Sequence, residues 1–331
     1  MTQEKEHYYK YKVKGLINMS SKRDISVDIA KGICIFLMVI GHADVPEIVF
    51  KWIYSFHMPF FFIVSGMFFN PPKYNTWKKF LLSRVKSLVV PYFSMSIIAA
   101  SLYCLIGNVD FKAMFTGWGG VALWFIPVLI VSEVVFYLIW QLVAKCKHCI
   151  VYAMLCSIIV LIGGYWLSCR DIHLLLQLDV VGMGCFFYSI GYLLRHWLKT
   201  ITMKWWCAGG LMLVYFIAIQ MLRTLDMCPN NFGSFPFSQV MAVAGSVLII
   251  ICARIVASWN VRNPSRIFLN WAGRNTLVVV GFSQVSISLL NYYGSEYIGA
   301  VFSIIKYVGI WGLLYVLALL LNRFLPFVVG K

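Results

Sequence analysis

Charged residues are scarce in this sequence. Asp and Glu together supply only 12 of the 331 residues, and all charged residues make up 12% of the chain against 61% hydrophobic residues. A water-soluble globular protein carries about 25% charged residues, so the composition excludes a soluble domain of this length. The apolar runs are long enough to cross a bilayer as helices. The sequence therefore predicts an all-α polytopic membrane protein.

The chain also lacks the patterns of a secreted or metal-binding protein. Residues 1–22 are polar and basic without an apolar core, so we expect no cleaved signal but a cytoplasmic basic tail, followed by one transmembrane domain at 23–331. Cys146-x2-Cys149 has no second ligand pair at a matching spacing, so we expect no metal. Cys169 and Cys228 fall in predicted outer loops, where a disulfide is possible but no distance is known.

The apolar runs predict about ten membrane spans, which the basic residues orient. With the N-terminus in the cytoplasm, the inner segments hold 22 of the 28 Lys and Arg residues and the outer segments hold 4. Positive residues collect on the cytoplasmic side, so we expect both termini inside and attribute the net charge of +16 to topology and lipid contact, not to nucleic-acid binding. The fifth to eighth spans are expected to be lipid-facing scaffold. The predicted spans are 27–45, 49–69, 81–106, 119–143, 150–168, 174–194, 205–222, 236–257, 275–292 and 298–321.

Three polar residues share one face of the first predicted span. Lys31 and His42 are eleven positions apart, so on a helix they differ by about 20° in azimuth and about 16 Å in height. Asp28 lies close to one turn before Lys31. Ionisable side chains within a span are costly unless they face protein or water, which makes this stripe a candidate functional site. The alternative is that Asp28 and Lys31 snorkel at one interface while His42 lies at the other.

The second predicted span carries a histidine beside a helix-breaking residue. Pro59 frees the carbonyl group four residues before it and should kink the helix, which places His57 near a polar opening. A role for His57 in substrate binding and a structural role as a core histidine bonded to that carbonyl carry equal weight. Ser65 is a candidate substrate contact, or a small residue that with Gly66 permits close helix packing.

Arg84 and Lys86 belong to a dense basic stretch on the predicted cytoplasmic side. A guanidinium binds phosphate through a bidentate fork, so both residues are candidate ligands of a phosphorylated donor. The alternative is topology and lipid contact. No P-loop or G-x-G-x-x-G motif occurs nearby, so this site would be built from side chains. Glu133 is a candidate substrate-binding residue whose carboxylate needs a partner within the membrane, and Lys31 or Arg84 could supply it.

Further candidates stand elsewhere in the chain. Trp124, near the outer end of the fourth span, is a candidate substrate-binding residue. Asn275 opens the ninth span, where it could cap the helix or bind the donor. The longest outer connection, D-M-C-P-N-N-F-G-S-F-P-F-S-Q at 226–239, could border an acceptor entrance.

Several of these motifs occur together in a known family. The chain carries D-I-A-K-G-I at 28–33, Gly41-His42 at the end of a Lys-x10-His spacing, F-H-M-P-F-F-F-I-V-S-G at 56–66, Arg84 with Pro91-Tyr92, L-W-F-I-P-V-L-I-V-S-E at 123–133 and G-R-N-T-L at 273–277. This combination resembles the membrane-bound acyltransferase family 3, and within it the sugar O-acetyltransferases related to fucose 4-O-acetylase. Family members often place a His about ten residues after the last glycine. This chain has Ser283 there, so we assign it no catalytic role.

The resemblance implies an integral O-acetyltransferase of the inner (cytoplasmic) membrane. Its donor would be acetyl-CoA, and its acceptor a sugar hydroxyl of a cell-surface polysaccharide or lipid-linked glycan. In that role His42 would be the general base. Lys31 and Arg84 would hold the phosphates of the donor or polarise the thioester oxygen, and Asp28 would fix Lys31. No Ser or Cys nucleophile with an adjacent base is visible, which favours direct transfer.

Two other classes of function remain as alternatives. A transporter or flippase for a lipid-linked or acylated molecule would use the polar stripe to line a pathway without making a bond. A structural or sensing membrane protein is disfavoured by the clustering of Lys31, His42, His57 and Arg84. Consumption of a thioester separates an acyltransferase from both.

Overall fold

The computed structural model describes residues 23–42, 45–74, 76–107, 122–294 and 300–331. Within these ranges the chain is helical and contains no strand. The predicted tail at 1–22 and the first residues of the spans predicted at 119–143 and 298–321 lie outside the described residues. The main helices are α2 (Ile25–Gly41), α3 (Glu47–Tyr54), α4 (His57–Met67), α5 (Trp77–Arg84), α6 (Val90–Cys104), α8 (Phe125–Val143), α9 (Cys149–Cys169), α10 (Val181–Leu198), α11 (Trp205–Gln220), α12 (Phe237–Ala257), α13 (Pro264–Arg274), α14 (Thr276–Tyr293) and α15 (Ala300–Phe324).

The prediction of an all-α polytopic membrane protein is confirmed. Eight helical stretches in the described part of the chain are long and apolar enough to cross a membrane. The other two predicted spans correspond to α2 and α11, which have 17 and 16 residues, fewer than the about 20 residues of a typical span. The count of ten spans and the placement of both termini inside stay predictions.

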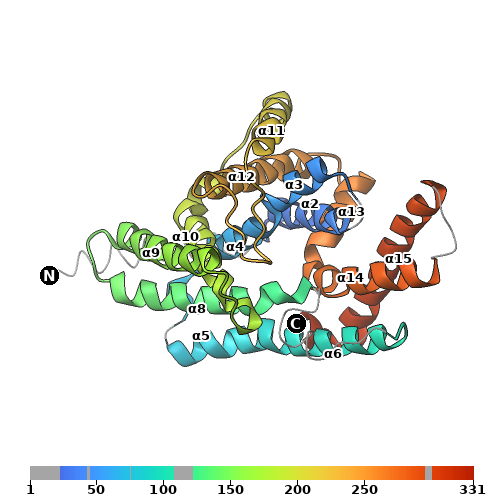
Figure 1. The fold of residues 1–331 in the computed structure, drawn as a ribbon, viewed down its shortest axis with the longest axis horizontal. Coiled ribbons are helices and arrows are strands. Elements are labelled where there is room, and N and C mark those ends of the chain that lie inside the picture. Colours follow the sequence, from blue (N-terminus) through green and yellow to red (C-terminus); the bar gives the residue numbers. More distant parts are fainter. Residues whose placement is uncertain (1–22, 43–44, 75, 108–121, 295–299) are drawn as a thin grey trace.

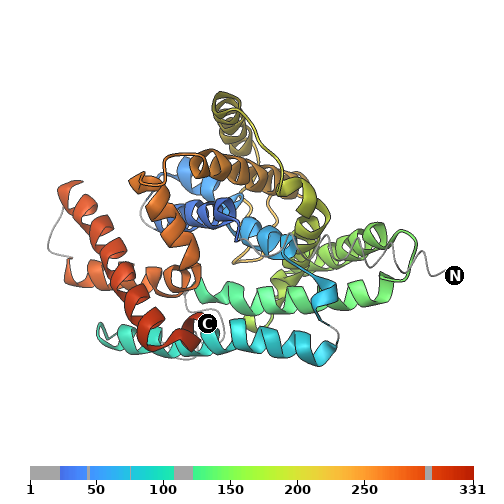
Figure 2. The ribbon, with the colours of Figure 1, turned by 180° about the vertical axis from the view of Figure 1, so that it is seen from behind.

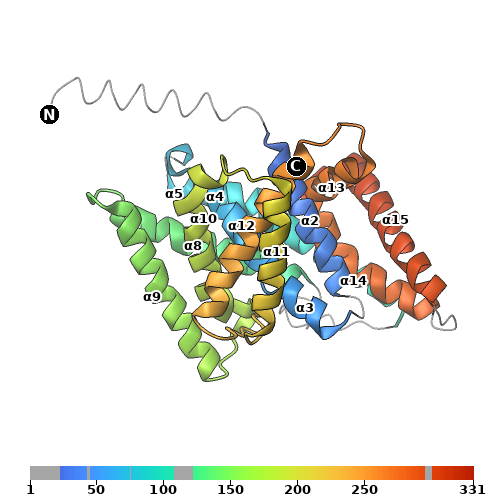
Figure 3. The same cartoon turned by 90° about the horizontal axis from the view of Figure 1, so that it is seen from above.

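Helix α2 lies within the helical bundle. It packs against α13, α12, α14 and α4, and Figure 1 shows these helices grouped between α9 on one side and α15 on the other. Figure 2, from behind, shows α5 and α6 along one long edge of the molecule. Figure 3 again places α9 and α15 at opposite edges. Along the polar stripe of α2, Asp28 is buried, whereas Lys31 and His42 are half-buried.

A pair of glycines brings α13 against α2. A Cβ atom at Gly273 would collide with the backbone oxygen of Asp28, and a Cβ atom at Gly32 would collide with that of Leu269. Only a residue without a side chain permits two helix backbones to approach this closely. The glycine of the G-R-N-T-L motif thus has a packing function, and it sets the start of α14 beside the Lys31 end of α2.

Two prolines mark irregular helix geometry. In the second span α3 ends at Tyr54 and α4 begins at His57, so the predicted break before Pro59 is confirmed. The residues before Pro91 form a π-helix, η2 (Val85–Val89). A π-helix is rare and often marks a functional region, because an inserted residue changes the direction of neighbouring side chains.

The expectation that the fifth to eighth spans are lipid-facing is wrong for α10. This helix packs against α4, α9 and α8, and 72% of its apolar window, which includes the 3₁₀ segment η4 (Leu175–Val180), is buried, against 22% for α9. A Cβ atom at Gly191 would collide with the backbone oxygen of Ile63, and one at Gly66 with that of Tyr188. The close packing expected at Gly66 is therefore confirmed, and α10 is its partner.

Candidate functional site

Two cavities lie along α2. The first, called here the histidine cavity, has a volume of about 300 Å³, and the second, called the basic cavity, about 270 Å³. His42 lines the first and Lys31 the second, so the predicted stripe joins two cavities. The histidine cavity is lined by Met38, His42, Phe50, Tyr54, His57, Met58, Phe61, Ala122, Trp124, Phe125, Gln177, Asp226, Cys228, Pro229, Val280 and Gln284. The basic cavity is lined by Arg23, Lys31, Phe61, Val64, Ser65, Leu88, Phe125, Leu129, Gly273, Arg274, Asn275, Thr276, Leu277, Val278, Asn322, Val329 and Lys331.

His42 is the C-cap residue of α2, directly after Gly41. Its Nδ1 atom lies 3.3 Å from the hydroxyl oxygen of Tyr54 on α3 and 3.4 Å from Nε2 of Gln284 on α14. No hydrogen bond joins Nε2 of His42 to any other residue in the described part of the chain. The described residues thus contact one ring nitrogen of His42 and leave the other without a hydrogen bond.

His57 lies in the same cavity as His42. Its Nδ1 atom is 3.0 Å from the backbone oxygen of Ile53, and its ring meets the Tyr54 ring edge-on with 4.7 Å between the centroids. Both interpretations of His57 are therefore still supported. As a buried core histidine it bonds a carbonyl near the helix break, although this is not the carbonyl that Pro59 leaves free, which belongs to residue 55. As a candidate substrate-binding residue it lines the cavity.

The outer connection predicted at 226–239 forms part of the cavity wall through Asp226, Cys228 and Pro229. The backbone of Asp226 exchanges hydrogen bonds of 3.0 and 2.8 Å with Asn231, and Oδ1 of Asp226 accepts one of 3.1 Å from the backbone N–H of Cys228. The carboxylate is thus held in place at the wall. Burial raises the pKa of Asp226 to about 6, so this group gains or loses a proton near neutral pH.

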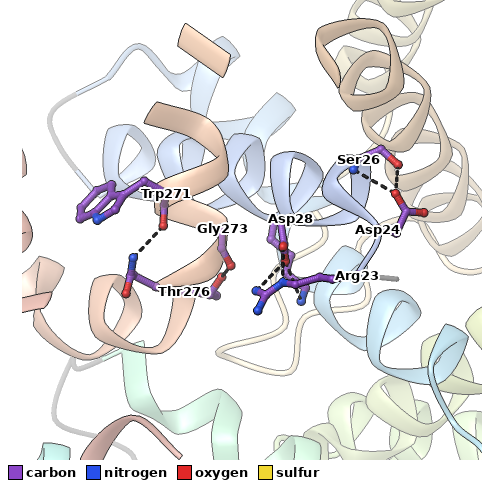
Figure 4. A network of polar contacts seen from close by, with 9 residues as sticks. Arg23, Asp24, Ser26, Asp28, Trp271, Gly273 and Thr276 are labelled. Atoms are coloured by element: carbon purple, nitrogen blue, oxygen red, sulfur yellow. Dashed lines mark hydrogen bonds and ion pairs between the residues drawn. The ribbon is translucent and has the colours of Figure 1, made fainter. Parts of the chain in front are cut away.

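The basic cavity gathers cations from both ends of the chain. Asp28 binds Arg23 at 2.5 Å and lies 3.9 Å from the ammonium group of Lys31, and Figure 4 shows Arg23 folded back over Asp28. Lys331 and Arg274 complete the set, and no described residue pairs with the guanidinium of Arg274. Four cations line this cavity, and two of them, Arg23 and Lys31, lie within 4 Å of the carboxylate of Asp28. Several cations in one cavity suit a ligand with several negative charges.

Asn275 connects this cavity to the turn between α13 and α14. Its Nδ2 donates to the backbone oxygen of Trp271 at 2.9 Å, and its Oδ1 accepts from Asn322 at 2.9 Å. Figure 4 shows the Trp271 carbonyl and the neighbouring contact between Gly273 and Thr276. Asn275 precedes α14 but its side chain makes no capping hydrogen bond. The capping alternative is therefore wrong, and the side chain lies in the cavity wall.

Phe61 and Phe125 lie where the two cavities meet, because both residues line both of them. Their centroids are 6.2 Å apart and the ring planes are tilted by 44°. Both residues are buried. A partition made of two side chains can open by rotation of a ring, whereas one made of backbone cannot.

Arg84 and Glu133 bind each other away from both cavities. The guanidinium of Arg84 lies 3.1 Å from the carboxylate of Glu133 and donates a hydrogen bond of 2.5 Å to Tyr74. Of the two partners considered for Glu133, the structure thus selects Arg84. Lys86 is exposed and lines neither cavity. Donor binding by Arg84 and Lys86, and substrate binding by Glu133, stay predictions, whereas Ser65 lies in the basic cavity and Trp124 in the histidine cavity.

The cysteines are free thiols in the structure, including Cys169 and Cys228. The possible disulfide between these two is therefore not formed. Among the residues that the structure describes, no group of three or more His, Cys, Asp or Glu is placed to hold a metal ion.

Sequence reasoning missed Gln177 and Gln284, and did not single out Asp226 within its loop. Gln284 was detectable as a polar residue within an apolar span, next to Ser283, which is buried. Gln177 has a φ of 54°, a left-handed conformation that non-glycine residues rarely adopt and that often marks a functional site. No sequence pattern indicates that conformation.

A family model described as an acyltransferase domain matches residues 24–324, from the residue that precedes α2 to the end of α15, and so includes almost the whole lining of both cavities. No curated protein and no solved structure matches the chain.

Proposed function

The chain belongs to the acyltransferase 3 family, and from this premise we propose that it transfers an acetyl group from acetyl-CoA to a sugar hydroxyl. The acceptor in this proposal is a cell-surface polysaccharide or a lipid-linked glycan, as in the sugar O-acetyltransferases related to fucose 4-O-acetylase that its motifs resemble. We place the enzyme in the inner (cytoplasmic) membrane with the basic cavity toward the cytosol. Family membership and the apolar helices support a membrane acyltransferase.

The proposal rests on one observation. Helix α2 supplies Lys31 to the wall of the cation-rich basic cavity and His42 to the wall of the histidine cavity. An acyl transfer from a phosphorylated thioester to a hydroxyl needs both, because the donor must be bound by its phosphates while a base acts on the acceptor. A transporter needs a polar pathway but no base whose second ring nitrogen is left for a substrate.

The basic cavity is the donor site in this proposal. The phosphates of acetyl-CoA would lie against Lys31 and Arg274, and the Asn275 side chain would supply a polar contact. Asp28, bonded to Arg23, would orient Lys31 from the side away from the donor. Arg84 lies elsewhere, so its predicted part in donor binding is kept as a separate test.

The histidine cavity is the acceptor site. Trp124 offers an aromatic surface, and Asp226 and Gln177 offer hydrogen-bonding groups in the wall of the same cavity. A mostly apolar wall with a few polar groups is typical of a small-molecule site, and an aromatic ring flanked by polar groups suits the alternating apolar and hydroxylated faces of a sugar. His57 would bind or orient the same ligand.

His42 acts as the general base in the proposed reaction. Its unbonded nitrogen takes the proton of the sugar hydroxyl while that oxygen attacks the thioester carbonyl carbon. The tetrahedral intermediate then collapses, the carbon–sulfur bond breaks, and the protonated imidazole returns the proton to the CoA thiolate. The sugar ester and free CoA are the products, and no acyl-enzyme forms.

The donor must reach from one cavity to the other. Lys31 and His42 are separated by about 16 Å along α2, the rise of eleven helical residues. The flexible arm of CoA, bound by its phosphates in the basic cavity, would pass between Phe61 and Phe125 to bring its acetyl group to His42. Closing the two rings on the arm would exclude water from the thioester.

Acetyl-CoA labelled in its acetyl group tests this proposal with the purified protein in lipid nanodiscs. We expect chromatography to detect free CoA together with a labelled ester on the sugar, at a rate that rises with acceptor concentration. His42→Ala should abolish transfer but retain CoA binding. His148→Ala, a change at an exposed histidine between α8 and α9, is the matched control. Normal turnover in His42→Ala would exclude His42 as the base, and an intact thioester with every acceptor would favour a transporter.

A further inference from the structure

Gln284 is a residue to which neither the motifs nor the family match assigns a role. It lies on α14, lines the histidine cavity, and has its side-chain Nε2 3.4 Å from Nδ1 of His42. Its Oε1 is buried and has no hydrogen-bond partner among the described residues. An amide oxygen in that position is costly unless it finds a donor. The neighbouring imidazole can supply one.

The chemistry of the base decides which nitrogen of His42 carries hydrogen. A neutral imidazole has one N–H donor and one nitrogen with a lone pair. Tyr54 and Gln284 both approach Nδ1, so a hydroxyl of the acceptor has to be met by Nε2. For Nε2 to accept that proton, its lone pair must be free and the hydrogen must be on Nδ1.

Gln284 can accept a hydrogen bond from Nδ1 in that tautomer. A half-turn of its amide about the last side-chain bond exchanges the positions of Nε2 and Oε1, which sets the carbonyl oxygen against the Nδ1–H group of His42. This orientation gives Oε1 the donor that it lacks. The hydroxyl oxygen of Tyr54, 3.3 Å from the same Nδ1, is the competing acceptor.

We propose that Gln284 is a positioning residue for His42: its side-chain carbonyl accepts a hydrogen bond from Nδ1–H and so presents the lone pair of Nε2 to the acceptor hydroxyl. The inference rests on the proposed function, since it gives His42 the part of a base. As His42 takes the proton, the imidazole becomes positive and the hydrogen bond to the carbonyl strengthens. Gln284 thereby favours the transition state as well as the tautomer.

A glutamine has this effect without adding charge to the cavity. Among the described residues, the titratable groups that line the cavity around His42 are Tyr54 on α3, His57 on α4, and Asp226 and Cys228 in the outer connection. A carboxylate in place of the amide would accept the same hydrogen bond, but it would also stabilise the protonated imidazole. The low-pH limb of the rate profile should then move to higher pH.

Three variants test the proposal. Gln284→Leu should lower kcat by about 100-fold, the low end of what a positioned base contributes, with CoA affinity unchanged. Gln284→Glu should retain activity, and the low-pH limb of its rate profile should move to higher pH. A merely structural role of Gln284 would not produce this shift. Tyr54→Phe should change kcat far less than Gln284→Leu. Gln141→Leu, at an exposed position of α8, is the matched control.

A measurement on the unmodified protein makes the test independent of folding in the variants. Nuclear magnetic resonance of protein labelled in its histidine rings, with His42 assigned by difference against His42→Ala, reports which nitrogen carries hydrogen. We expect Nδ1–H in the native protein and a gain of Nε2–H in Gln284→Leu. Hydrogen on Nε2 of the native protein, or normal kcat in Gln284→Leu while His42→Ala is inactive, would overturn the role of Gln284 alone. Normal turnover in His42→Ala would overturn the proposed base as well.

Discussion

Replacing Lys31 with alanine should weaken CoA binding without destabilising the helical bundle. The ammonium group of Lys31 is 3.9 Å from Asp28, whereas Arg23 binds the same carboxylate at 2.5 Å. Asp28 therefore keeps its nearer partner in the variant, and no buried charge is left unpaired. The loss of one charge-assisted hydrogen bond to a phosphate costs about 1.5–3 kcal/mol, which corresponds to an increase in the Kd for CoA of about 10- to 150-fold.

Isothermal titration calorimetry of CoA with the protein in nanodiscs measures this change. Lys31→Arg should restore part of the affinity, because a guanidinium also binds phosphate but is longer. Lys145→Ala, at an exposed position between α8 and α9, is the control for loss of one positive charge. Combining Lys31→Ala with His42→Ala should be little worse for transfer than the poorer single variant, since the two residues act on one donor. An unchanged Kd in folded Lys31→Ala would mean that Lys31 does not bind CoA and is an interfacial anchor.

Four further results are expected. Arg274→Ala should raise the Kd for CoA. Arg84→Ala should reduce the amount of folded protein, because an unpaired buried Glu133 costs about 3–5 kcal/mol. A folded Arg84→Ala protein with weakened CoA binding would instead support the donor role predicted from the sequence. Phe125→Ala should increase the release of CoA in the absence of acceptor, because it opens the partition to water, and unchanged hydrolysis would contradict that role. The KM for the sugar should fall as pH rises through about 6. Asp226 ionises in this range, and its carboxylate then accepts hydrogen bonds from the hydroxyl groups of the sugar. The same pH dependence of KM in Asp226→Asn would contradict this role of Asp226.

The helices could be predicted from the sequence because their signals are local. Apolar runs of sufficient length and the position of Pro59 indicated the spans and the break between α3 and α4. The burial of α10 could not be predicted in the same way. A helix that is apolar on all sides has the same hydropathy whether it faces lipid or protein, and the contact of Gly191 with α4 depends on tertiary packing.

The same distinction between local patterns and tertiary packing applies to the candidate site. The helical period alone placed Lys31 and His42 on one face, and the structure puts each in a cavity wall. The pairing of Arg84 with Glu133 joins residues 49 positions apart, and the approach of Gln284 to His42 joins residues 242 positions apart. Neither contact follows from a local pattern, because each depends on how whole helices cross.

In the proposed reaction one donor molecule occupies both cavities. A structure of the protein with a non-hydrolysable acetyl-CoA analogue in nanodiscs is the decisive measurement. We expect the phosphates against Lys31 and Arg274, the arm between Phe61 and Phe125, and the acyl group beside His42. An analogue bound at Arg84 and Lys86, outside both cavities, would contradict the claim, as would an acyl group that stays on the Lys31 side of the two rings.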